Sequence, residues 1–336
     1  MKQIQSMSVR IVAPARLHLG FLDMHGGLGR YFGSLGLSLS DIHTVLDMSR
    51  AVDISATGPC ADRARDCAAS MLTQLDIDSG VRIEIKQAIP QHAGLGSGTQ
   101  MSLAVGTGIA RLYELELTTS EIALILDRGN RSGIGIGAFM HGGFIVDGGQ
   151  SEQSKLPPII SHLDFPQAWR FILVFDTSRK GIDGFAERQA FRQLPAMDER
   201  IAADMCRLLL MQILPAIVEQ ECRQFGAAIT AIQQLAGEYF ADMQGGIYNS
   251  PVVESVLNFL LKQGAAGVGQ SSWGPTGFAI FSNETDACQA LKQIRKQWHD
   301  ESCLEFALCS AKNSKAEVLL EETVVTDSIN LWGQVS

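Results

Sequence analysis

Hydrophobic and polar positions form a different pattern in successive parts of the first half of the chain. Residues 9–13, 44–57 and 81–88 have the pattern expected of strands, and residues 61–75 and 101–115 have the pattern expected of helices. Residues 118–121 fit a capping box that opens a further helix, running to about residue 127. Strands and helices are therefore expected together in this half.

The second half is predicted to contain a strand at residues 171–175, followed mainly by helices. Helical patterns cover residues 197–214, 215–235, 251–262 and 287–298, and strands are expected at residues 276–281 and 304–310. The polar, proline-bearing residues 151–167 predict a boundary, so we expect one domain at residues 1–160 and another at residues 161–336. Because strands and helices do not alternate regularly, we expect an α+β fold rather than a doubly wound sheet.

The composition of the 336 residues, 46% hydrophobic and 19% charged, is typical of a soluble globular protein with one large or two ordinary domains. The net charge of −9 argues against broad nucleic-acid binding, which needs a basic surface. No apolar run reaches the length of a membrane span, and residues 1–8 lack the apolar core of a signal peptide. The cysteines are scattered without a Cys-x-x-Cys pair, so neither zinc nor a disulfide framework is indicated. We therefore expect a cytoplasmic enzyme.

A glycine-rich stretch at residues 89–100 connects a predicted strand to a predicted helix. Glycines let the backbone approach a ligand closely, and the free N–H groups of a helix start point at it with the positive end of the helix dipole. We therefore expect a phosphate or pyrophosphate site, while a tight turn that binds nothing is the alternative for an isolated Gly-x-Gly. The candidate phosphate-binding residues are Gly94, Gly96, Ser97, Gly98, Thr99 and Gln100.

Residues 14–23 form a second candidate site. Arg16 and His18 are two positions apart, so in an extended segment their side chains point the same way. Arginine suits phosphate or carboxylate, and histidine can serve as a general base or as a hydrogen-bond donor. Asp23 is a candidate to hold a metal or to orient a base. Taken singly, each of these residues is equally compatible with a surface or capping role.

The glycine cluster at residues 128–137 carries Arg128 and Arg131. Arginines beside alternating glycines predict another anion site, or a loop that closes over one, with a solvated basic turn as the alternative. Arg131 and the adjacent Ser132 are the candidate phosphate-binding residues of this loop.

Residues 267–277 place Ser271, Ser272 and Trp273 among glycines, between a predicted helix and a predicted strand. An indole can stack on a flat ligand while neighbouring hydroxyls bond its polar groups. A core tryptophan under a loop is the alternative.

The last candidates are Asp183 and Glu187, four positions apart. If a helix begins by residue 183, the two carboxylates share a face of it and can flank magnesium or a proton-transfer site. Ordinary helix-capping acids explain them equally well. The catalytic candidates are Arg16, His18, Asp23 and Glu187, and no metal ligands are assigned.

Three motifs, at residues 14–23, 90–100 and 267–277, together resemble the GHMP kinase superfamily in the same order along the chain. The match covers most of the sequence. It implies an N-terminal domain like domain 2 of ribosomal protein S5, a ferredoxin-like C-terminal domain, and an active site between them.

A closer resemblance is to one branch of that superfamily, the beta-ribofuranosylaminobenzene 5'-phosphate synthases. Residues 131–135, 142–149 and 269–275 are similar to signatures of the branch. Kinases of the superfamily often carry an aspartate base in a Gly-Ile-Asp context, whereas here Gly133-Ile134 is followed by Gly135. Gly98 also replaces a serine usual in the kinase loop. Some superfamily kinases lack that aspartate, so its absence does not decide the matter alone.

The branch resemblance implies a phosphoribosyltransferase that joins phosphoribosyl pyrophosphate to 4-aminobenzoate or 4-hydroxybenzoate. Carbon dioxide and pyrophosphate are released, in a step of tetrahydromethanopterin biosynthesis. We expect Arg16 and Arg131 to hold anionic groups of the substrates, and Ser271, Ser272 and Trp273 to line the aromatic acceptor. We also expect Mg²⁺ as the cofactor without an organic one, a homodimer, and no nucleic-acid or membrane partner. An ATP-dependent small-molecule kinase is the alternative, and a non-catalytic sensor of a phosphorylated metabolite is a third reading.

Overall fold

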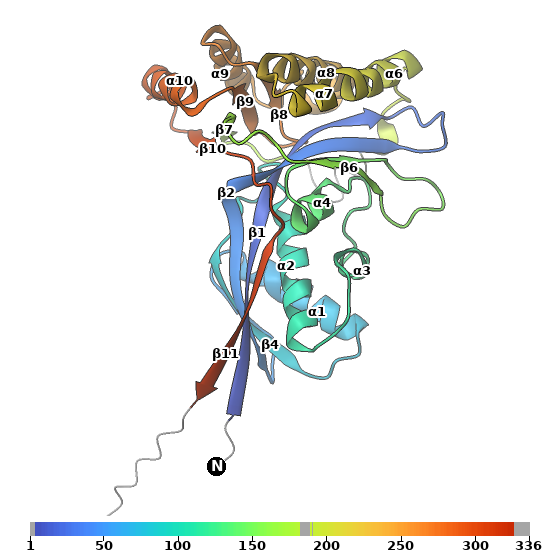
Figure 1. Ribbon diagram of the computed structural model, residues 1–336, viewed down its shortest axis with the longest axis vertical. Coiled ribbons are helices and arrows are strands. Elements are labelled where there is room, and N and C mark those ends of the chain that lie inside the picture. The colour runs from blue at the N-terminus through green and yellow to red at the C-terminus, as the bar shows by residue number, and fades with distance from the viewer. Residues whose placement is uncertain (1–3, 182–188, 190, 326–336) are drawn as a thin grey trace, which may run out of the picture.

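The first half of the chain folds around a large, mostly antiparallel sheet. The computed structural model describes residues 4–181, 189 and 191–325. The strands of this sheet are β1 (Ile4–Asp23), β2 (Phe32–Ala51), β3 (Ser55–Thr57), β4 (Gly80–Gln87), β5 (Phe144–Asp147), β6 (Ile159–Leu163) and β11 (Glu317–Val325). Their order is β11-β1-β2-β4-β3, and β5 joins β2 to β6. In Figure 1 the long strands form the lower part of the molecule, and both described chain ends lie at its tip.

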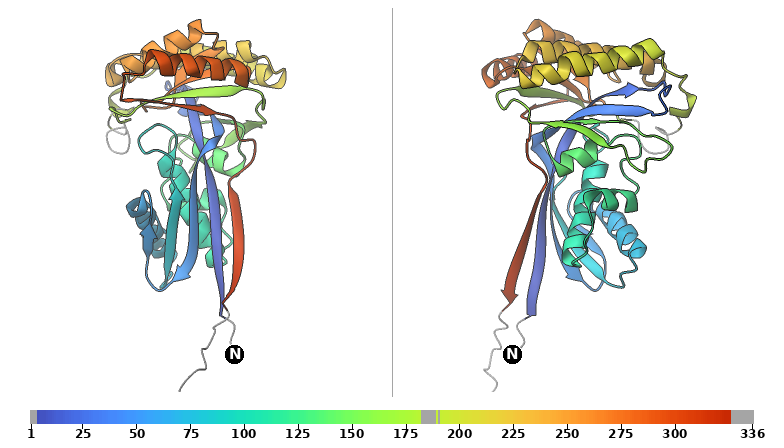
Figure 2. Two further views of the ribbon diagram at one scale, coloured as in Figure 1. Left: turned by 90° about the vertical axis from the view of Figure 1, so that its left-hand side faces the viewer. Right: turned by 45° about the vertical axis from the view of Figure 1, so that its right-hand side comes forward.

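Four helices gather on one side of this sheet (Figures 1 and 2). They are α1 (Ala61–Gln74), α2 (Ser97–Leu112), α3 (Thr119–Ile125) and α4 (Ile134–Met140). Helix α2 is buried along nearly its whole length, against α1 and β1. The predicted capping box of α3 is confirmed, because the Thr118 hydroxyl accepts from the Glu121 N–H at 3.2 Å and the Glu121 carboxylate accepts from the Thr118 N–H at 2.7 Å.

The second half combines a four-stranded sheet with a layer of helices, the upper layer in Figure 1. The strands are β7 (Arg170–Asp176), β8 (Gly267–Gln270), β9 (Gly277–Phe281) and β10 (Leu304–Cys309), in the order β10-β7-β9-β8. The helices are α6 (Glu199–Leu208), the π-helix η1 (Leu209–Ile213), α7 (Leu214–Val218), α8 (Cys222–Gln244), α9 (Pro251–Lys262) and α10 (Glu284–Gln297). The expected α+β fold is confirmed.

The two faces of the second sheet pack against different partners. Ile172 and Val174 of β7 pack with residues of α9 and α10. Phe171 and Leu173, on the other face, pack with residues of α8 and of the β1–β2 hairpin. The hairpin therefore joins the two halves through one hydrophobic core. This shared core fixes the loops at the upper end of the hairpin relative to the loops of the second half.

The structure draws the domain boundary differently from the sequence. The predicted boundary at residue 160 falls inside β6, which pairs with β5 in the first sheet. The segment β11 returns from the C-terminal end to pair with β1, from Ile4 opposite Val325 to Val12 opposite Glu317. This pairing satisfies backbone groups that would leave β1 as an open edge.

One continuous helical stretch, Glu199–Val218, is long and apolar enough to cross a membrane by length and composition alone. This differs from the prediction that no apolar run reaches the length of a membrane span, and from the prediction of one helix up to residue 214 and another from residue 215. The π-helix η1 ends at Ile213, two residues before Pro215. Proline lacks an N–H and crowds the preceding turn, and the wider π-turn lets the helix continue through it. Ile213 and Ile217 of this stretch are buried in the core shared by both halves.

Candidate active site

The loops predicted to bind ligands converge on one cleft of about 430 Å³. Its walls come from β1, the start of α2, residues 127–132 and residues 272–274, so both halves of the chain contribute. Candidates that line it are Arg16, His18, Gly94, Gly96, Ser97, Gly98, Thr99, Arg131, Ser132, Ser272 and Trp273. The sequence motifs therefore meet in space although they lie far apart along the chain.

The glycine-rich loop ends in an uncapped helix start at this cleft. Gly96 is the N-cap of α2 with φ +82°, no side chain caps the helix, and its first turn carries no acidic residue. Ser97, Gly98 and Thr99 of that first turn line the cleft. A helix start that has open N–H groups and the positive end of the dipole favours an anion, as phosphate binding requires.

Ser271 ties three of the motifs together from behind the cleft wall. Its hydroxyl accepts from the backbone N–H of His18 at 3.0 Å and donates to the carbonyl of Gly94 at 2.7 Å. Arg16 Nη1 donates to the same Gly94 carbonyl at 2.5 Å. A Cβ at Gly94, whose φ is +75°, would overlap the carbonyl oxygen of Ser271, so the approach of these loops requires glycine.

Irregular pairing in β1 directs Arg16 and His18 to the cleft. The register against β2 shifts between Pro14 and Arg16, and again between His18 and Gly20. Such bulges bend a strand and re-aim its side chains. Both Arg16 and His18 line the cleft, as expected of side chains two positions apart.

The His18 imidazole is neutral in this setting. Its side chain is 2% exposed, and burial, followed by the nearby charges of Arg16 and Arg131, lowers the pKa of the ring to about 3. The ring is therefore unsuited to hold a proton at neutral pH. It can still accept or donate a hydrogen bond as a neutral group.

Positive charge concentrates at the cleft although the chain as a whole is acidic. Among the described residues, the arginines that line it are Arg16, Arg63, Arg128 and Arg131, and the one lining carboxylate is Asp127. Arg128 is held by Ser102, whose hydroxyl accepts from its Nε at 3.0 Å. The Arg131 guanidinium lies 5.2 Å from the centre of the Phe191 ring. This local field favours an anionic ligand against the overall charge of −9.

A buried carboxylate, Asp147, shapes the loop that carries Arg131 and Ser132. It accepts from the N–H of Gly133 at 2.8 Å and from the hydroxyls of Ser34 and Ser132. Burial raises the pKa of Asp147, while these hydrogen bonds oppose the rise. Asp147 is therefore a positioning residue that holds Ser132 at the cleft.

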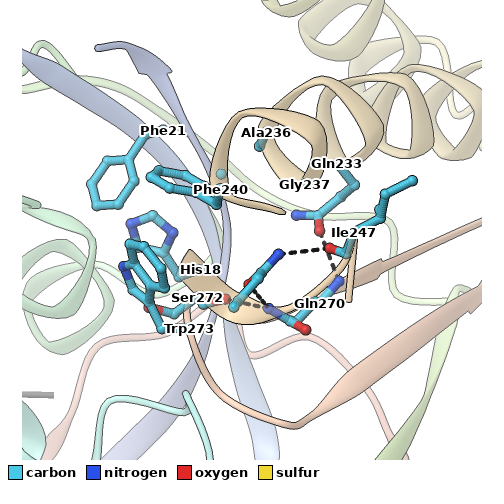
Figure 3. Close-up of a pocket in the computed structure, with 12 residues that line it drawn as sticks. His18, Phe21, Gln233, Ala236, Gly237, Phe240, Ile247, Gln270, Ser272 and Trp273 are labelled. Atoms are coloured by element: carbon cyan, nitrogen blue, oxygen red, sulfur yellow. Dashed lines mark hydrogen bonds between the residues drawn. The ribbon is translucent and has the colours of Figure 1, made fainter. Parts of the chain in front are cut away.

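A second, smaller cavity of about 40 Å³ adjoins the cleft, and His18, Phe21, Ser272 and Trp273 line both. Figure 3 shows the rings of His18, Phe21, Phe240 and Trp273 on one side of it, and Gln233 and Gln270 on the other. Trp273 is 3% exposed and packs on Phe240 at 4.6 Å between ring centres. It is thus a core residue that also lines the cleft, and its predicted contact with an aromatic ligand stays a prediction.

Several candidates occupy other positions. Asp23 lies at the far end of β1, where its carboxylate accepts from the N–H groups of His25 and Gly26, and it lines neither cavity. Gln100 is fully buried, and its Nε2 donates to the Gly135 carbonyl at 2.7 Å. Ser271 lines neither cavity either. The positions of Asp23, Gln100 and Ser271 support structural roles, in contrast to the predicted contacts with substrate.

Asp183 and Glu187 lie outside the described residues, so their roles stay predictions. The sequence analysis missed Arg63 and Asp147. Arg63 stands in the first turn of α1, close to Gly98 of the glycine-rich loop, with 3.6 Å between Arg63 Nη1 and the place of a Cβ at Gly98. No local pattern marked it, because only tertiary packing brings α1 beside the cleft.

Gly135 occupies the position where the superfamily kinases often carry an aspartate. It lies in the first turn of α4, and a Cβ there would come within 2.8 Å of Thr99 Cγ2. A carboxylate at this position would therefore require the Thr99 side chain to move. The cleft thus combines an uncapped helix start with a residue that has no acidic side chain at position 135.

Comparisons with known proteins agree with this geometry. The family model described as GHMP kinases N terminal domain matches residues 62–143, and that described as GHMP kinases C terminal matches residues 213–300. A beta-ribofuranosylphenol 5'-phosphate synthase of Archaeoglobus fulgidus is 35% identical over 285 residues, which cover 81% of this chain and 87% of that protein. Its counterpart from Methanocaldococcus jannaschii is 33% identical over 300 residues, covering 80% and 88%.

The chain belongs to the beta-ribofuranosylphenol 5'-phosphate synthase family within the GHMP kinase superfamily. Its fold is also that of solved GHMP kinases. The L. major mevalonate kinase in complex with R-mevalonate aligns with a TM-score of 0.68 at 16% identity, over 93% of this chain and 99% of that one. A homoserine kinase of Methanopyrus kandleri is 24% identical over 284 residues, covering 80% and 88%. Kinase relatives are therefore more distant than the synthases.

Proposed function

We propose that this protein joins phosphoribosyl pyrophosphate to 4-hydroxybenzoate and releases carbon dioxide and pyrophosphate, in a step of tetrahydromethanopterin biosynthesis. The observation that carries the proposal is the composition of one cleft. It combines an uncapped helix start and four lining arginines with a partly aromatic wall formed by Phe21 and Trp273. A polyanionic sugar donor and a flat acceptor need these two surfaces side by side. A volume of about 430 Å³ also suits two small substrates.

The donor fits the arginine side of the cleft. Its pyrophosphate would accept hydrogen bonds from the N–H groups at the start of α2, near Ser97 and Thr99, and from Arg16. Arg131 would hold the 5'-phosphate or the acceptor carboxylate. Holding both substrates in one orientation supplies much of the rate enhancement when bond making needs no covalent enzyme intermediate.

The reaction balances without a net proton transfer. The bond from ribose C1 to pyrophosphate breaks with its electron pair on the leaving oxygen, and the ring carbon that bears the carboxylate bonds to C1. The bond from the ring carbon to the carboxylate then breaks and releases carbon dioxide. The electron pair of that bond stays on the ring and restores its aromaticity. Since no group of the enzyme has to give or take a proton, a neutral His18 is compatible with the reaction. The arginines stabilise the charge that develops on pyrophosphate.

Magnesium is proposed to arrive with the pyrophosphate rather than in a protein cage. The described part of the chain holds no group of three or more His, Cys, Asp or Glu that could bind a metal ion. Asp127, which lines the cleft, is the described carboxylate suited to contribute one oxygen ligand, because Mg²⁺ is often bound by one or two carboxylates plus substrate phosphates. When bound, the ion would neutralise part of the leaving group's charge.

The printed names of the synthase relatives favour a hydroxyl on the acceptor. Those proteins are called ribofuranosylphenol synthases, and a phenol product carries over the hydroxyl of 4-hydroxybenzoate. We therefore propose 4-hydroxybenzoate as the acceptor ahead of 4-aminobenzoate. A homodimer and a cytoplasmic location stay predictions.

The proposal is tested with purified protein, phosphoribosyl pyrophosphate, Mg²⁺ and 4-hydroxybenzoate labelled in its carboxyl group. Release of labelled carbon dioxide together with an equal amount of pyrophosphate is expected. If the protein instead consumed ATP and phosphorylated a small alcohol without releasing pyrophosphate, the kinase alternative would replace this proposal. If it bound the donor without turnover in either assay, a sensor role would replace it.

A further inference from the structure

Two buried ring nitrogens at the cleft lack hydrogen-bond partners within the described part of the chain. They are Nε2 of His18 and Nε1 of Trp273. Both side chains are nearly fully buried, with 2% and 3% exposed, and both line the cleft and the small cavity behind it. Buried polar atoms in proteins are almost always paired. Because both residues border the same two cavities, a ligand group there can supply the missing partner.

The two nitrogens have complementary hydrogen-bonding capacity. The indole Nε1–H of Trp273 can only donate. A neutral imidazole donates from one ring nitrogen and accepts at the other, and with the proton on Nδ1 the unpaired Nε2 of His18 presents a lone pair. A ligand atom that satisfies both nitrogens in this tautomer must donate and accept at once.

The surrounding side chains favour an aromatic ring that carries this group. Phe21 lies 4.6 Å from the His18 ring, and Phe240 lies 4.6 Å from the Trp273 ring, measured between ring centres. Figure 3 shows these four rings gathered on one side of the small cavity. Such a wall excludes water from the two nitrogens and offers edges and faces to a flat ligand.

We propose that His18 and Trp273 bind the 4-hydroxyl of the aromatic acceptor and so determine acceptor specificity, an inference that rests on the proposed function. The hydroxyl donates to Nε2 of His18 and accepts from Nε1–H of Trp273. An aromatic amine donates well but accepts poorly, so it leaves the indole N–H unpaired. A carboxylate would meet the lone pair of His18, so the acceptor's carboxylate end is turned away from these nitrogens and toward the arginines. The pair therefore sets both the preference for a hydroxyl and the orientation of the ring.

The test compares two acceptors in variants that keep a ring at each position. Trp273→Phe removes the donor, and His18→Phe removes the acceptor. Each should lower kcat/KM for 4-hydroxybenzoate by about three- to tenfold, the range of one net hydrogen bond. Trp273→Phe should lower kcat/KM for 4-aminobenzoate less, because the amine makes no bond to the indole N–H. His18→Phe should lower it for both benzoates alike, because both donate to Nε2. The control is Trp298→Phe, whose ring packs on Phe259 away from the cleft and should leave both acceptors unchanged.

The outcomes separate this inference from the proposed function. A wild-type preference for the amine, or an equal loss for both acceptors in folded Trp273→Phe, would overturn the assignment while the synthase activity stands. If the wild type formed no product from either acceptor, the proposed function would fail, and calorimetric binding of the two benzoates would still test the pair. Tighter binding of 4-hydroxybenzoate that disappears in Trp273→Phe supports the assignment. Equal binding of both benzoates refutes it.

Discussion

Removing one hydroxyl, in Ser271→Ala, should loosen the junction of the three sequence motifs that meet at the cleft. Ser271 is fully buried, and its hydroxyl satisfies the N–H of His18 at 3.0 Å and one lone pair of the Gly94 carbonyl at 2.7 Å. Gly94 keeps its bond from Arg16, so the variant orphans one buried N–H. An orphaned buried donor costs about 1–3 kcal/mol, which is the expected loss in unfolding free energy. We also expect kcat/KM to fall, because the glycine-rich loop loses its anchor to the second half.

Urea unfolding followed by circular dichroism measures this loss as a lower midpoint. Thr276→Val is the matched control at the other end of the same loop. The Thr276 side chain is also fully buried, but its hydroxyl has no partner among the residues that the structure describes, so its removal should be neutral or stabilising. The reasoning is refuted if Ser271→Ala stays within about 0.5 kcal/mol of the wild type, or if Thr276→Val is equally destabilised.

Three further predictions concern the same cleft. Gly96→Ala should raise the KM for the donor, because the φ of Gly96 is +82° and the new Cβ would lie 3.2 Å from the Arg16 side chain. Gly98→Ala is the control, since its Cβ would lie 3.6 Å from Arg63 and should be tolerated. Equal KM values for the donor in the two variants would contradict this prediction. Arg16→Ala and Arg131→Ala should each lower kcat/KM roughly ten- to a hundredfold, the effect of about 1.5–3 kcal/mol, and full activity in both would remove them from the site. The pKa of His18 falls from 6.5 to about 3 on folding, so the unfolded chain takes up a proton between these values and the folded one does not. As the pH falls from about 6.5 to 5, the unfolding free energy of the wild type should therefore decrease by up to ~1.4 kcal/mol per pH unit more than that of His18→Phe. If urea titrations gave both proteins the same pH dependence, the ring would not be held neutral.

Local patterns in the sequence were sufficient to predict the helix start that forms the proposed anion cradle. A strand, a glycine-rich loop and a helix start are contiguous, so the cradle at Gly96 and Ser97 depends on backbone geometry that nearby residues encode. The common direction of Arg16 and His18 followed from the period of two in a strand. The capping box at Thr118 was likewise set by residues three apart.

Long-range packing decided what the sequence could not predict. The hydroxyl of Ser271 looks available for a ligand in the sequence, but it bonds Gly94, 177 positions away. Arg63 reaches the cleft because α1 packs beside α2, and the return of β11 to β1 is a pairing between the two ends of the chain. A π-helix before Pro215 carried a helix past a residue that usually ends one.

The most direct test of the account is the stoichiometry of one reaction. Purified protein is supplied with phosphoribosyl pyrophosphate, Mg²⁺ and carboxyl-labelled 4-hydroxybenzoate, and carbon dioxide, pyrophosphate and the coupled product are quantified together. The account predicts equal amounts of all three, in a reaction that needs no ATP. Pyrophosphate release without loss of the carboxyl label, or activity that depends on ATP, would contradict it.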